Sequence, residues 1–326
     1  MENSFVHPYM PNSAPENKKA MLDELGINSV EDIYKSIIPD ELLYKERLDI
    51  PEPIRSEYEL KRHVMGILNR DITTEEYTSF LGAGCYKHQV PAICDEINSR
   101  GEFLTAYCGD TYSDHGKMQA IFEYTSMMGE LLDTDVVSYT TYDGGQAVAS
   151  SLRMAVRAVR EKGMAGKVIL VPKTMNPEIY SQVVQYCRNV AEVRKIAYEP
   201  ETGLMDLEEL KEQLAKKNVA AVFFENPTYL GNFETRGEEI AKLAHDAGAY
   251  CVVQTEVAAL GIMESPVNQG ADIVCGDIQP LGMHIQFGGG QAGFIACNQN
   301  MDLVEQFPTY MYGITETEKE DTYGWG

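Results

Sequence analysis

The stretch "VAAVFFENPTYLGNFETRGEEIAKLAHDAGAYCVVQ" (Val219–Gln254) decides the fold class. Its opening run, VAAVFFEN, is apolar and rich in β-branched and aromatic residues, which is typical of a buried strand. The spacing of apolar residues then predicts a helix over Glu234–Gly248, and AYCVVQ predicts a second strand. Nearly continuous apolar strands joined by amphipathic helices indicate a mainly parallel sheet that is covered on both faces.

The same alternation extends outward from this stretch, beginning at about Val136. Upstream, DVVSYTT, KVILVP and AEVRKIAY predict strands, and helices are predicted over Gln146–Lys162, Pro177–Asn189 and Asp206–Lys217. Downstream, ADIVCGD predicts a further strand, and GQAGFIACN predicts a strand that turns back after the glycines. We therefore predict an α/β fold with a mainly parallel, mixed sheet and helices on both faces.

The first part of the chain has a different character. APENKKAMLDELG has helical spacing and stops at Gly26, and Ser29 with Asp32 three residues later resembles a helix-capping pair. A further helix carries one apolar face, formed by Leu60, Val64, Ile67 and Leu68. We expect residues 1–80 to form a helical and extended segment that lacks a large core and wraps a neighbouring chain. Residues 81–326 should form the large α/β domain.

Composition excludes several functional classes. The formal net charge of −23 argues against a nucleic-acid surface and disfavours an anionic membrane, and it favours solubility. The cysteines form no CxxC pair and several lie in apolar runs, so we expect free, buried thiols and a reducing compartment. We find no signal peptide and no apolar run that could span a bilayer, and we expect a cytoplasmic location. The cysteines occupy positions 85, 94, 108, 187, 251, 275 and 297.

In such sheets, ligands bind beyond the carboxyl ends of the strands. In YDGGQ, Gly144 and Gly145 follow a strand and open a helix, so their backbone N–H groups either cradle a phosphate or only form a tight turn. Asp143 counts against a phosphate, because its carboxylate would lie beside the anion. Glu256 follows AYCVVQ and is interpreted first as a carboxylate at the rim of the site.

The loop GDIQPLGMHIQFGGGQAG (Gly276–Gly293) is rich in glycine but contains no lysine. Indeed, no lysine occurs between Lys242 and Lys319. Two interpretations of these glycines stay open. They could allow another backbone or a phosphate to approach closely, or they could simply form a hairpin before the last strand. These glycines are Gly288, Gly289 and Gly290.

Two polar stretches precede the sheet. SFLGAGCYKHQVPAI brings Tyr86 and His88 beside a glycine-rich turn, and Tyr107 and Asp110 follow in TAYCGDTYSDHG. These residues either line a site or belong to ordinary loops. The acidic and histidine positions of the second stretch match no spacing known for metal ligands, so no metal site is expected.

Two long stretches carry a family resemblance. SFLGAGCYKHQVPAICDEINSRGEFLTAY and QAIFEYTSMMGELLDTDVVSYTTYDGGQAVASSLRMAVR resemble the glycine decarboxylase P-protein, and specifically the first (α) subunit of its two-subunit bacterial form. The leading segment, FFENPTYLGNFE and GDIQPLGMHIQFGGGQAGFIAC fit the same family in order. The resemblance implies the fold-type-I architecture of pyridoxal-phosphate enzymes. It also implies that the cofactor lysine lies in a β subunit, and that Leu281 stands here where that lysine would be.

The family implies a function and partners. The complex decarboxylates glycine and passes the aminomethyl group to the lipoyl arm of the H-protein. The chain would join a lysine-bearing β subunit in a hetero-oligomer, and pyridoxal phosphate would be bound mainly or wholly by that partner. Candidate residues at the interface are Tyr86, His88, Tyr107 and Asp110, and possible loop contacts to the cofactor are Gly144, Gly145, Glu256, Gly288, Gly289 and Gly290.

The sequence departs from the family in two places. TAYCGDTYSDHGKMQ stands where members usually carry a TPYQPE-S-G type run, so a divergent paralogue acting on another amino acid, or a non-catalytic scaffold, stays open. Where the chain ends in DTYGWG, the family continues with a smaller α/β domain, so we expect a fragment that lacks this domain.

Overall fold

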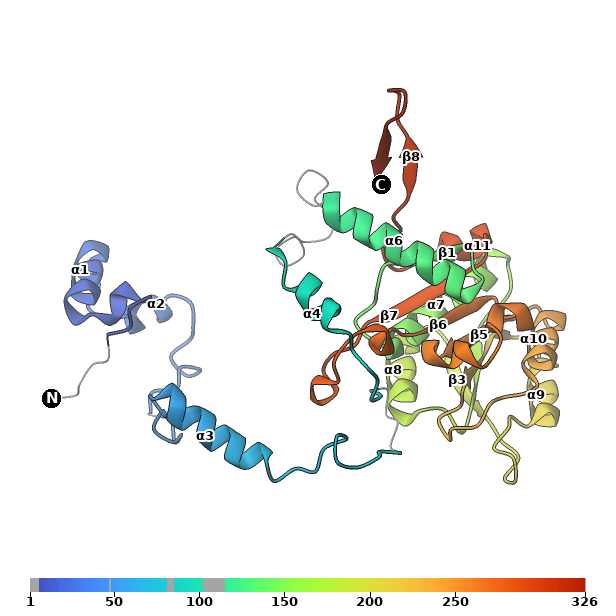
Figure 1. The fold of residues 1–326 in the computed structure, drawn as a ribbon, viewed down its shortest axis with the longest axis horizontal. Helices are drawn as coiled ribbons and strands as arrows, with labels where there is room; N and C mark the ends of the chain where they lie inside the picture. The colour runs from blue at the N-terminus through green and yellow to red at the C-terminus, as the bar shows by residue number, and fades with distance from the viewer. Residues whose placement is uncertain (1–5, 47, 81–84, 102–114, 326) are drawn as a thin grey trace. The chain divides into compact units, whose positions relative to one another are not determined.

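The computed structural model describes residues 6–46, 48–80, 85–101 and 115–325, and it divides into two compact units. The first unit is Met1–Ile72 and the second is Thr73–Gly326 (Figure 1). The division falls after Ile72, whereas the sequence analysis placed the boundary after residue 80. Each unit is described below by itself.

The first unit is helical, as expected, and its helix ends follow the predicted signals. Helix α1 ends at Gly26, which adopts a left-handed conformation with φ of 68°. Asp32 accepts a hydrogen bond from the backbone N–H of Ser29 at 3.1 Å, so the short acid does replace the usual glutamate of a capping pair. The helical elements are η1 (Pro11–Ser13), α1 (Pro15–Leu25), α2 (Glu31–Tyr34) and α3 (Glu57–Leu68).

This unit has no apolar core of its own. Among its described residues, Ala14 is the one hydrophobic side chain that is buried. On α3, the apolar positions Leu60, Val64 and Ile67 are all more than 40% exposed. The segment is therefore organised by local helix signals rather than by packing.

A seven-stranded sheet forms the centre of the second unit, counted over its described residues. The strand order is β1-β7-β6-β5-β4-β2-β3. The five strands from β6 to β3 are parallel, β7 runs antiparallel to β6, and β1 runs antiparallel to β7. This confirms the mainly parallel, mixed sheet and the strand that turns back. The strands are β1 (Val136–Val137), β2 (Val168–Pro172), β3 (Glu192–Ile196), β4 (Val219–Asn226), β5 (Tyr250–Thr255), β6 (Ile273–Asp277) and β7 (Gly293–Cys297).

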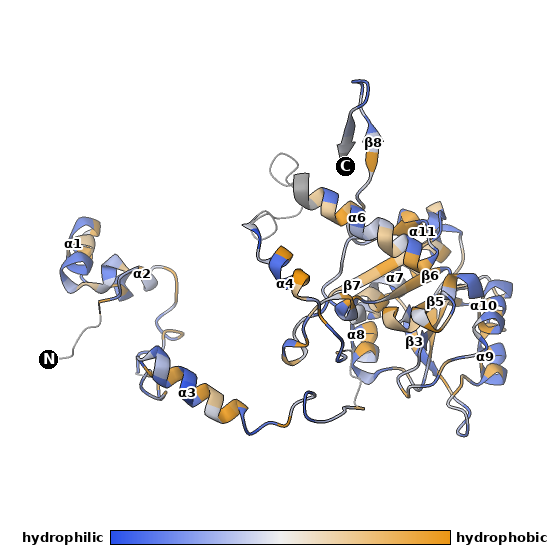
Figure 2. Ribbon diagram, in the orientation of Figure 1, coloured by the Kyte–Doolittle hydropathy of each residue, from blue (hydrophilic) through white to orange (hydrophobic). Residues whose placement is uncertain are grey.

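Helices cover both faces of this sheet, as predicted. Figure 2 shows that apolar residues concentrate in the strands and that the helices are amphipathic. The helices of this unit are α4 (Ala92–Asn98), α6 (His115–Leu132), α7 (Gly144–Glu161), α8 (Pro177–Cys187), α9 (Leu207–Leu214), α10 (Gly237–Asp246) and α11 (Met301–Val304). Helices α7, α8 and α11 pack on one face, and α6, α9 and α10 pack on the other.

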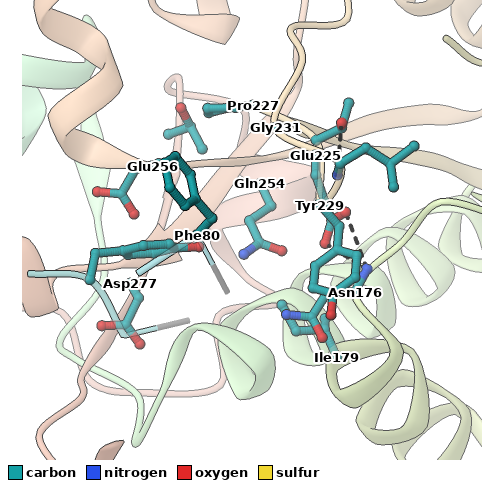
Figure 3. A pocket seen from close by; sticks show the side chains of 14 residues that line it. Phe80, Asn176, Ile179, Glu225, Pro227, Tyr229, Gly231, Gln254, Glu256 and Asp277 are labelled. Carbon is teal, nitrogen blue, oxygen red and sulfur yellow. Dashed lines mark hydrogen bonds between the residues drawn. The ribbon is translucent and has the colours of Figure 1, made fainter. Parts of the chain in front are cut away.

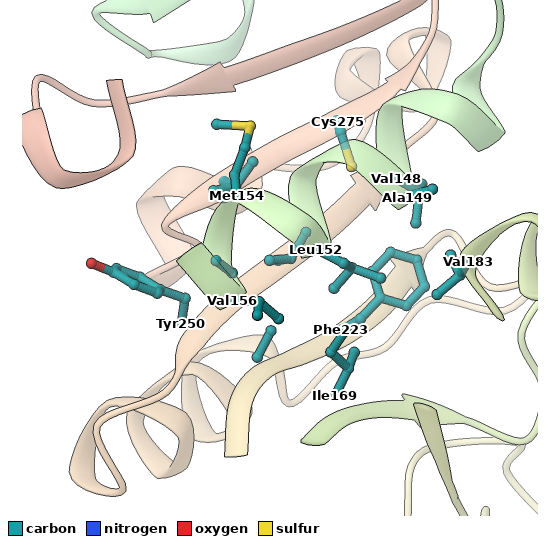
Figure 4. Close-up of a cluster of buried hydrophobic side chains, with 14 of the residues drawn as sticks. Val148, Ala149, Leu152, Met154, Val156, Ile169, Val183, Phe223, Tyr250 and Cys275 are labelled. Atoms are coloured by element: carbon teal, nitrogen blue, oxygen red, sulfur yellow. The ribbon is translucent and has the colours of Figure 1, made fainter. Parts of the chain in front are cut away.

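The alternation of side chains along β4 shows how two cores arise from one strand. Phe223 packs into the core beneath α7 and α8, together with Leu152 and Val183 (Figure 4). Its neighbour Phe224 points to the opposite core, against Ile240 of α10. Successive residues of a strand face opposite sides, so a strand buried on both faces is apolar along most of its length, and β4 becomes polar only at its carboxyl end.

Short elements complete the second unit. The 3₁₀ turns η2 (Val257–Gly261), η3 (Pro266–Gln269), η4 (Gln279–Leu281) and η5 (Gln286–Gly288) occupy the loops after β5 and β6. A separate hairpin pairs β8 (Ile314–Glu316) with β9 (Tyr323–Trp325), and the sequence analysis did not predict it.

The described cysteines are all free, as expected. Four of them lie buried in the sheet or on α8, namely Cys187, Cys251, Cys275 and Cys297. Burial raises the pKa of the Cys187 thiol to about 11, which makes it an unreactive apolar side chain. Within the part of the chain that the structure describes, no helix has the length and apolar character needed to cross a membrane.

Candidate active site

A cavity of about 300 Å³ lies at the carboxyl ends of the central strands (Figure 3). Parallel strands bring the residues that follow them to the same edge of the sheet, so loops far apart in sequence meet there. The wall combines side chains from the ends of β4, β5 and β6, from the loop after β2, and from the segment before α4. The lining residues that enter the argument are Tyr86, Asn176, Glu225, Gln254, Glu256 and Asp277.

Glu225 is the most deeply buried acid of the cavity, with 5% of its surface exposed. Its two carboxylate oxygens accept the backbone N–H of Asn176 at 3.1 Å and 3.3 Å. The side chain of Asn176 in turn caps α8 by accepting from Glu178 N at 2.9 Å. Burial raises the pKa of Glu225 to about 7, although hydrogen bonds from the backbone pull it down.

Glu256 and Gln254 come from the end of β5. Glu256 caps η2 by accepting the N–H of Ala258 at 3.2 Å, and burial raises its pKa to about 7. The side-chain oxygen of Gln254 is buried and has no hydrogen-bond partner among the described residues. Figure 3 shows Gln254 reaching into the cavity between Glu256 and Glu225.

Asp277 ends β6 and binds the beginning of α7. One oxygen, Oδ2, accepts the N–H of Gly144 at 2.8 Å, and the other, Oδ1, accepts the N–H of Gln279 at 2.8 Å. Asp143 caps the same helix by accepting from Gln146 N at 2.6 Å. Burial raises the pKa of Asp277, and its backbone hydrogen bonds oppose that shift. The amino end of α7 is therefore already bound by two carboxylates of this chain.

The structure brings some of the expected site residues together and separates others. Tyr86 and Glu256 both line the cavity, and Gly144 and Gly145 line a smaller hollow beside it that shares Asp277. His88 binds the carbonyl oxygen of Tyr86 through Nδ1 at 2.9 Å and does not line this cavity. Gly288, Gly289 and Gly290 belong to η5 and the turn after it, outside the cavity wall. Tyr107 and Asp110 lie outside the described residues.

Sequence reasoning named the right loops but missed three of their side chains. Glu225, Asn176 and Asp277 were not proposed as site residues, although the stretches that contain them were singled out. The signal was present, because each is among the first polar residues at the carboxyl end of a buried strand or in the loop after it. That rule alone selects too many residues, since it does not show which side chains turn inward.

The family model described as "Glycine cleavage system P-protein" matches residues 7–323, which is nearly the whole chain. The chain belongs to the glycine cleavage system P-protein family.

Individual relatives of this P-protein chain share one description, "Probable glycine dehydrogenase (decarboxylating) subunit 1". The protein from Pyrococcus horikoshii is 38% identical over 310 residues, covering 94% of this chain and 67% of the relative. The protein from Staphylothermus marinus is 35% identical over 322 residues, covering 95% of this chain and 66% of the relative. The chain thus spans about two thirds of the length of the proteins it matches.

Solved structures confirm the fold-type-I α/β architecture. A crystal structure of glycine decarboxylase (P-protein) of the glycine cleavage system, in inhibitor-bound form, matches with a TM-score of 0.78 and 31% identity. That match covers 98% of this chain and 68% of the solved chain. A sphingosine-1-phosphate lyase from Burkholderia pseudomallei matches with a TM-score of 0.57 at 13% identity, covering 89% of this chain and 68% of the lyase, which supports the fold alone.

The P-protein fold belongs to pyridoxal-phosphate enzymes, and a site for that cofactor needs a primary amine and groups that bind its phosphate. No lysine lines the cavity, and Leu281 of η4, which is 50% exposed, does not line it either. The N–H of Gly144 is already bound by Asp277, and the neutral Gln254 is the next-to-last residue of β5. A phosphate at the start of α7 would meet the carboxylates of Asp277 and Asp143, which already accept the N–H groups of Gly144 and Gln146. The residues present do not fit the cofactor.

Proposed function

We propose that this chain is the subunit of a glycine-decarboxylase-like complex that does not carry the cofactor lysine. In this proposal, the complex decarboxylates glycine and transfers the aminomethyl group to the lipoyl group of an H-protein. The cofactor, pyridoxal phosphate, is held by a homologous lysine-bearing subunit. The observation that carries the proposal is that no lysine lines the cavity, and that Leu281, near the position that the family resemblance gives to the lysine, lies in a stretch free of lysine between Lys242 and Lys319.

The relatives are described as subunit 1, and this description supports assembly with a second, different subunit. Proteins described as subunit 1 imply a second subunit, and a chain whose own cavity rejects the cofactor needs a partner that accepts it. Covalent attachment of an aldehyde cofactor requires a primary amine, which neither leucine nor glutamine supplies. The free thiols of the described cysteines favour a reducing, cytoplasmic setting for this complex.

Within the complex, this chain would contribute architecture and residues near the partner's site. We propose Tyr86, His88, Tyr107 and Asp110 as the interface candidates. Of these, Tyr86 lines the cavity from the segment before α4. If Tyr86 serves turnover, Tyr86→Phe should lower kcat while co-purification with the partner stays unchanged. Lost assembly with normal kcat in the residual complex would make its role structural.

Reconstitution tests the proposal directly. The chain is purified alone and together with a lysine-bearing homologous subunit from the same cell, and exchange of labelled carbon dioxide into glycine is measured with lipoylated H-protein. We expect exchange only from the combination. Borohydride reduction followed by mass spectrometry should place pyridoxal phosphate on the partner alone.

Lysine variants provide the matched control. Lys242→Arg and Lys319→Arg replace the lysines that flank the lysine-free stretch, and both should leave exchange unchanged. Exchange by this chain alone, or pyridoxal phosphate fixed to one of its own lysines, would overturn the proposal. Exchange of a different amino acid by an otherwise active combination would instead identify a divergent paralogue, and assembly without any exchange would leave a scaffold.

A further inference from the structure

The contact between Asp277 and the amino end of α7 places a carboxylate where the helix would otherwise bind an anion. Asp277 Oδ2 lies 2.8 Å from Gly144 N, and Asp277 Oδ1 lies 2.8 Å from Gln279 N and 3.4 Å from Ala292 N. The first N–H groups of a helix have no partner within the helix and carry partial positive charge, so they favour a negative group. Asp277 supplies that group from within the chain.

Asp277 and Gln182 both pack closely against the backbone at the start of α7. A Cβ atom placed on Gly144 would lie 3.1 Å from Asp277 Cβ and 3.2 Å from Asp277 N. A Cβ atom on Gly145 would lie 2.6 Å from the side-chain oxygen of Gln182. The backbone at the start of α7 is thus in direct contact with Asp277 on one side and Gln182 on the other.

No cation in the surrounding hollow offsets the carboxylate of Asp277. The smaller hollow at the start of α7 is lined by Asp143, Glu178 and Asp277, and none of its lining residues is lysine, arginine or histidine. A phosphate that entered beside Asp277 would lie against the carboxylate that already accepts the N–H of Gly144, without a countercharge, which is costly in a partly buried site.

We infer that Asp277 is a built-in anion that fills the phosphate position at the start of α7 and thereby makes this chain reject anionic ligands. Asp277 is then a specificity-determining residue, and the missing lysine is a separate reason why the cofactor is not held. The inference rests on the proposed function only in that it explains why the phosphate-bearing cofactor belongs to the partner. It predicts that shortening Asp277 creates an anion site in the chain itself.

The test measures binding of inorganic phosphate to the purified full chain by equilibrium dialysis. Wild type should show no saturable binding at millimolar phosphate, whereas Asp277→Ala should bind phosphate at least tenfold more tightly. Phosphate should also raise the thermal unfolding temperature of D277A and leave that of the wild type unchanged, because a ligand stabilises only the state that binds it. Pyridoxal phosphate, tested in the same assay without reduction, should show the same preference.

Two further variants separate the effect of the volume of the Asp277 side chain from the effect of negative charge in the cavity. Asp277→Asn removes the charge but keeps the volume, so it should bind no phosphate. Glu256→Gln removes one charge from the same cavity and leaves the contact between Asp277 and Gly144 intact, so it should also bind none. If D277A folds poorly, Asp277→Ser carries the same prediction and keeps a short hydrogen-bonding group.

Several outcomes would overturn the inference. The first is phosphate binding by the wild type as tight as that by D277A. The second is no gain in phosphate affinity in either D277A or Asp277→Ser, and the third is an equal gain in phosphate affinity in E256Q. The assay uses this chain alone and does not depend on exchange activity. If D277A gains phosphate binding but the reconstituted wild-type complex shows no carbon dioxide exchange, the proposed function is refuted and the inference stands. If the complex exchanges carbon dioxide but D277A gains no phosphate binding, the inference alone is refuted.

Discussion

The carboxylate of Glu225, at the end of β4, binds the backbone N–H of Asn176, at the start of α8, with a distance of 3.1 Å from Oε1 to N. This contact ties a central strand to the helix that covers it, and it does so with a group that is almost completely buried. Because burial raises the pKa of Glu225 to about 7, folding and protonation are coupled here.

The first prediction follows from that coupling. The pKa of Glu225 is about 7 in the folded protein and 4.5 in the unfolded chain. Between pH 4.5 and pH 7, the folded state therefore binds more protons at this residue than the unfolded state does. The free energy of unfolding should therefore be highest below pH 4.5 and fall as pH rises to 7, by on the order of 3 kcal/mol for this group. Glu256, whose pKa is also about 7, titrates in the same window.

Urea unfolding of wild type and Glu225→Gln between pH 4.5 and 8 measures this effect. Glutamine keeps an acceptor for Asn176 N but cannot ionise. The free energy of unfolding of the variant should therefore fall with rising pH by about half as much as that of the wild type, and the variant should be the more stable protein at pH 8. Identical pH profiles for the two proteins would contradict the raised pKa of Glu225.

A second prediction concerns two glycines that face different kinds of neighbour. A Cβ atom on Gly276 would lie 2.3 Å from the backbone oxygen of Thr255, whereas one on Gly145 would meet only the movable side chain of Gln182. Gly276→Ala should cost about 3 kcal/mol or more, because backbone in the sheet cannot give way. Gly145→Ala should cost clearly less, since Gln182 can adopt another rotamer. Equal losses in chemical denaturation would show that the strand ends of β5 and β6 are less rigid than the structure indicates.

A third prediction concerns a buried ion pair. Glu234 is 3% exposed, and its carboxylate lies 3.3 Å from Arg236 Nε and accepts from Met205 N at 2.9 Å. Arg236→Ala should lower the free energy of unfolding by about 3 kcal/mol, because it leaves a buried carboxylate without its cation. The double variant E234Q/R236A should recover part of that loss. If the double variant is as unstable as the sum of two independent losses, the two residues are not coupled.

A fourth prediction is that restoring the missing amine is not enough. Leu281→Lys places a primary amine near the position that the family resemblance gives to the lysine, but Asp277 still binds Gly144 N and the neutral Gln254 still lies near the end of β5. After incubation with pyridoxal phosphate and reduction, peptide mass spectrometry should find no more cofactor on residue 281 than on surface lysines. The double variant L281K/D277A should show more. Efficient labelling of L281K alone would mean that the anion position does not control the cofactor.

The fold was predictable because hydrophobic periodicity marks each strand and helix of the second unit. The ends of the helices were less predictable, since each end depends on the backbone conformation of one or two residues. Helix α8 stops at Cys187 instead of Asn189, where Asn189 has a φ of 68°, and α9 stops at Leu214 before Lys217, where φ is 51°. Non-glycine residues adopt such left-handed conformations only when surrounding contacts favour them, and periodicity does not report those contacts.

Strand β1 shows a second limit. The run DVVSYTT predicted a strand, and the ladder contains only Val136 and Val137 before an isolated bridge between Thr141 and Gly293. In between, the hydroxyl of Ser138 accepts from Ile295 N at 3.2 Å and replaces a regular backbone contact. Side chains that compete with the backbone in this way depend on a partner strand more than 150 residues away, which local patterns cannot reveal.

The candidate site was predictable as a place and not as a set of side chains. The rule that ligands lie beyond the strand ends selected the loops after β4, β5 and β6. It could not show that Asp277 turns toward Gly144, because that contact joins residues 133 positions apart. The missing lysine, by contrast, needed no structure, since an absent amine is visible in the sequence itself.

The charged margin of the sheet limits how this chain can assemble. Strand β3 is terminal in the sheet order, and its sequence EVRKI places Glu192, Arg194 and Lys195 along that edge. Arg194 is bound by Glu192 and Gln213, and Lys195 lies over the ring of Tyr180. Such residues discourage another strand from joining the open ladder. Association with a second polypeptide must then proceed through surfaces other than this strand, and uncontrolled fibre-like growth from this margin is suppressed.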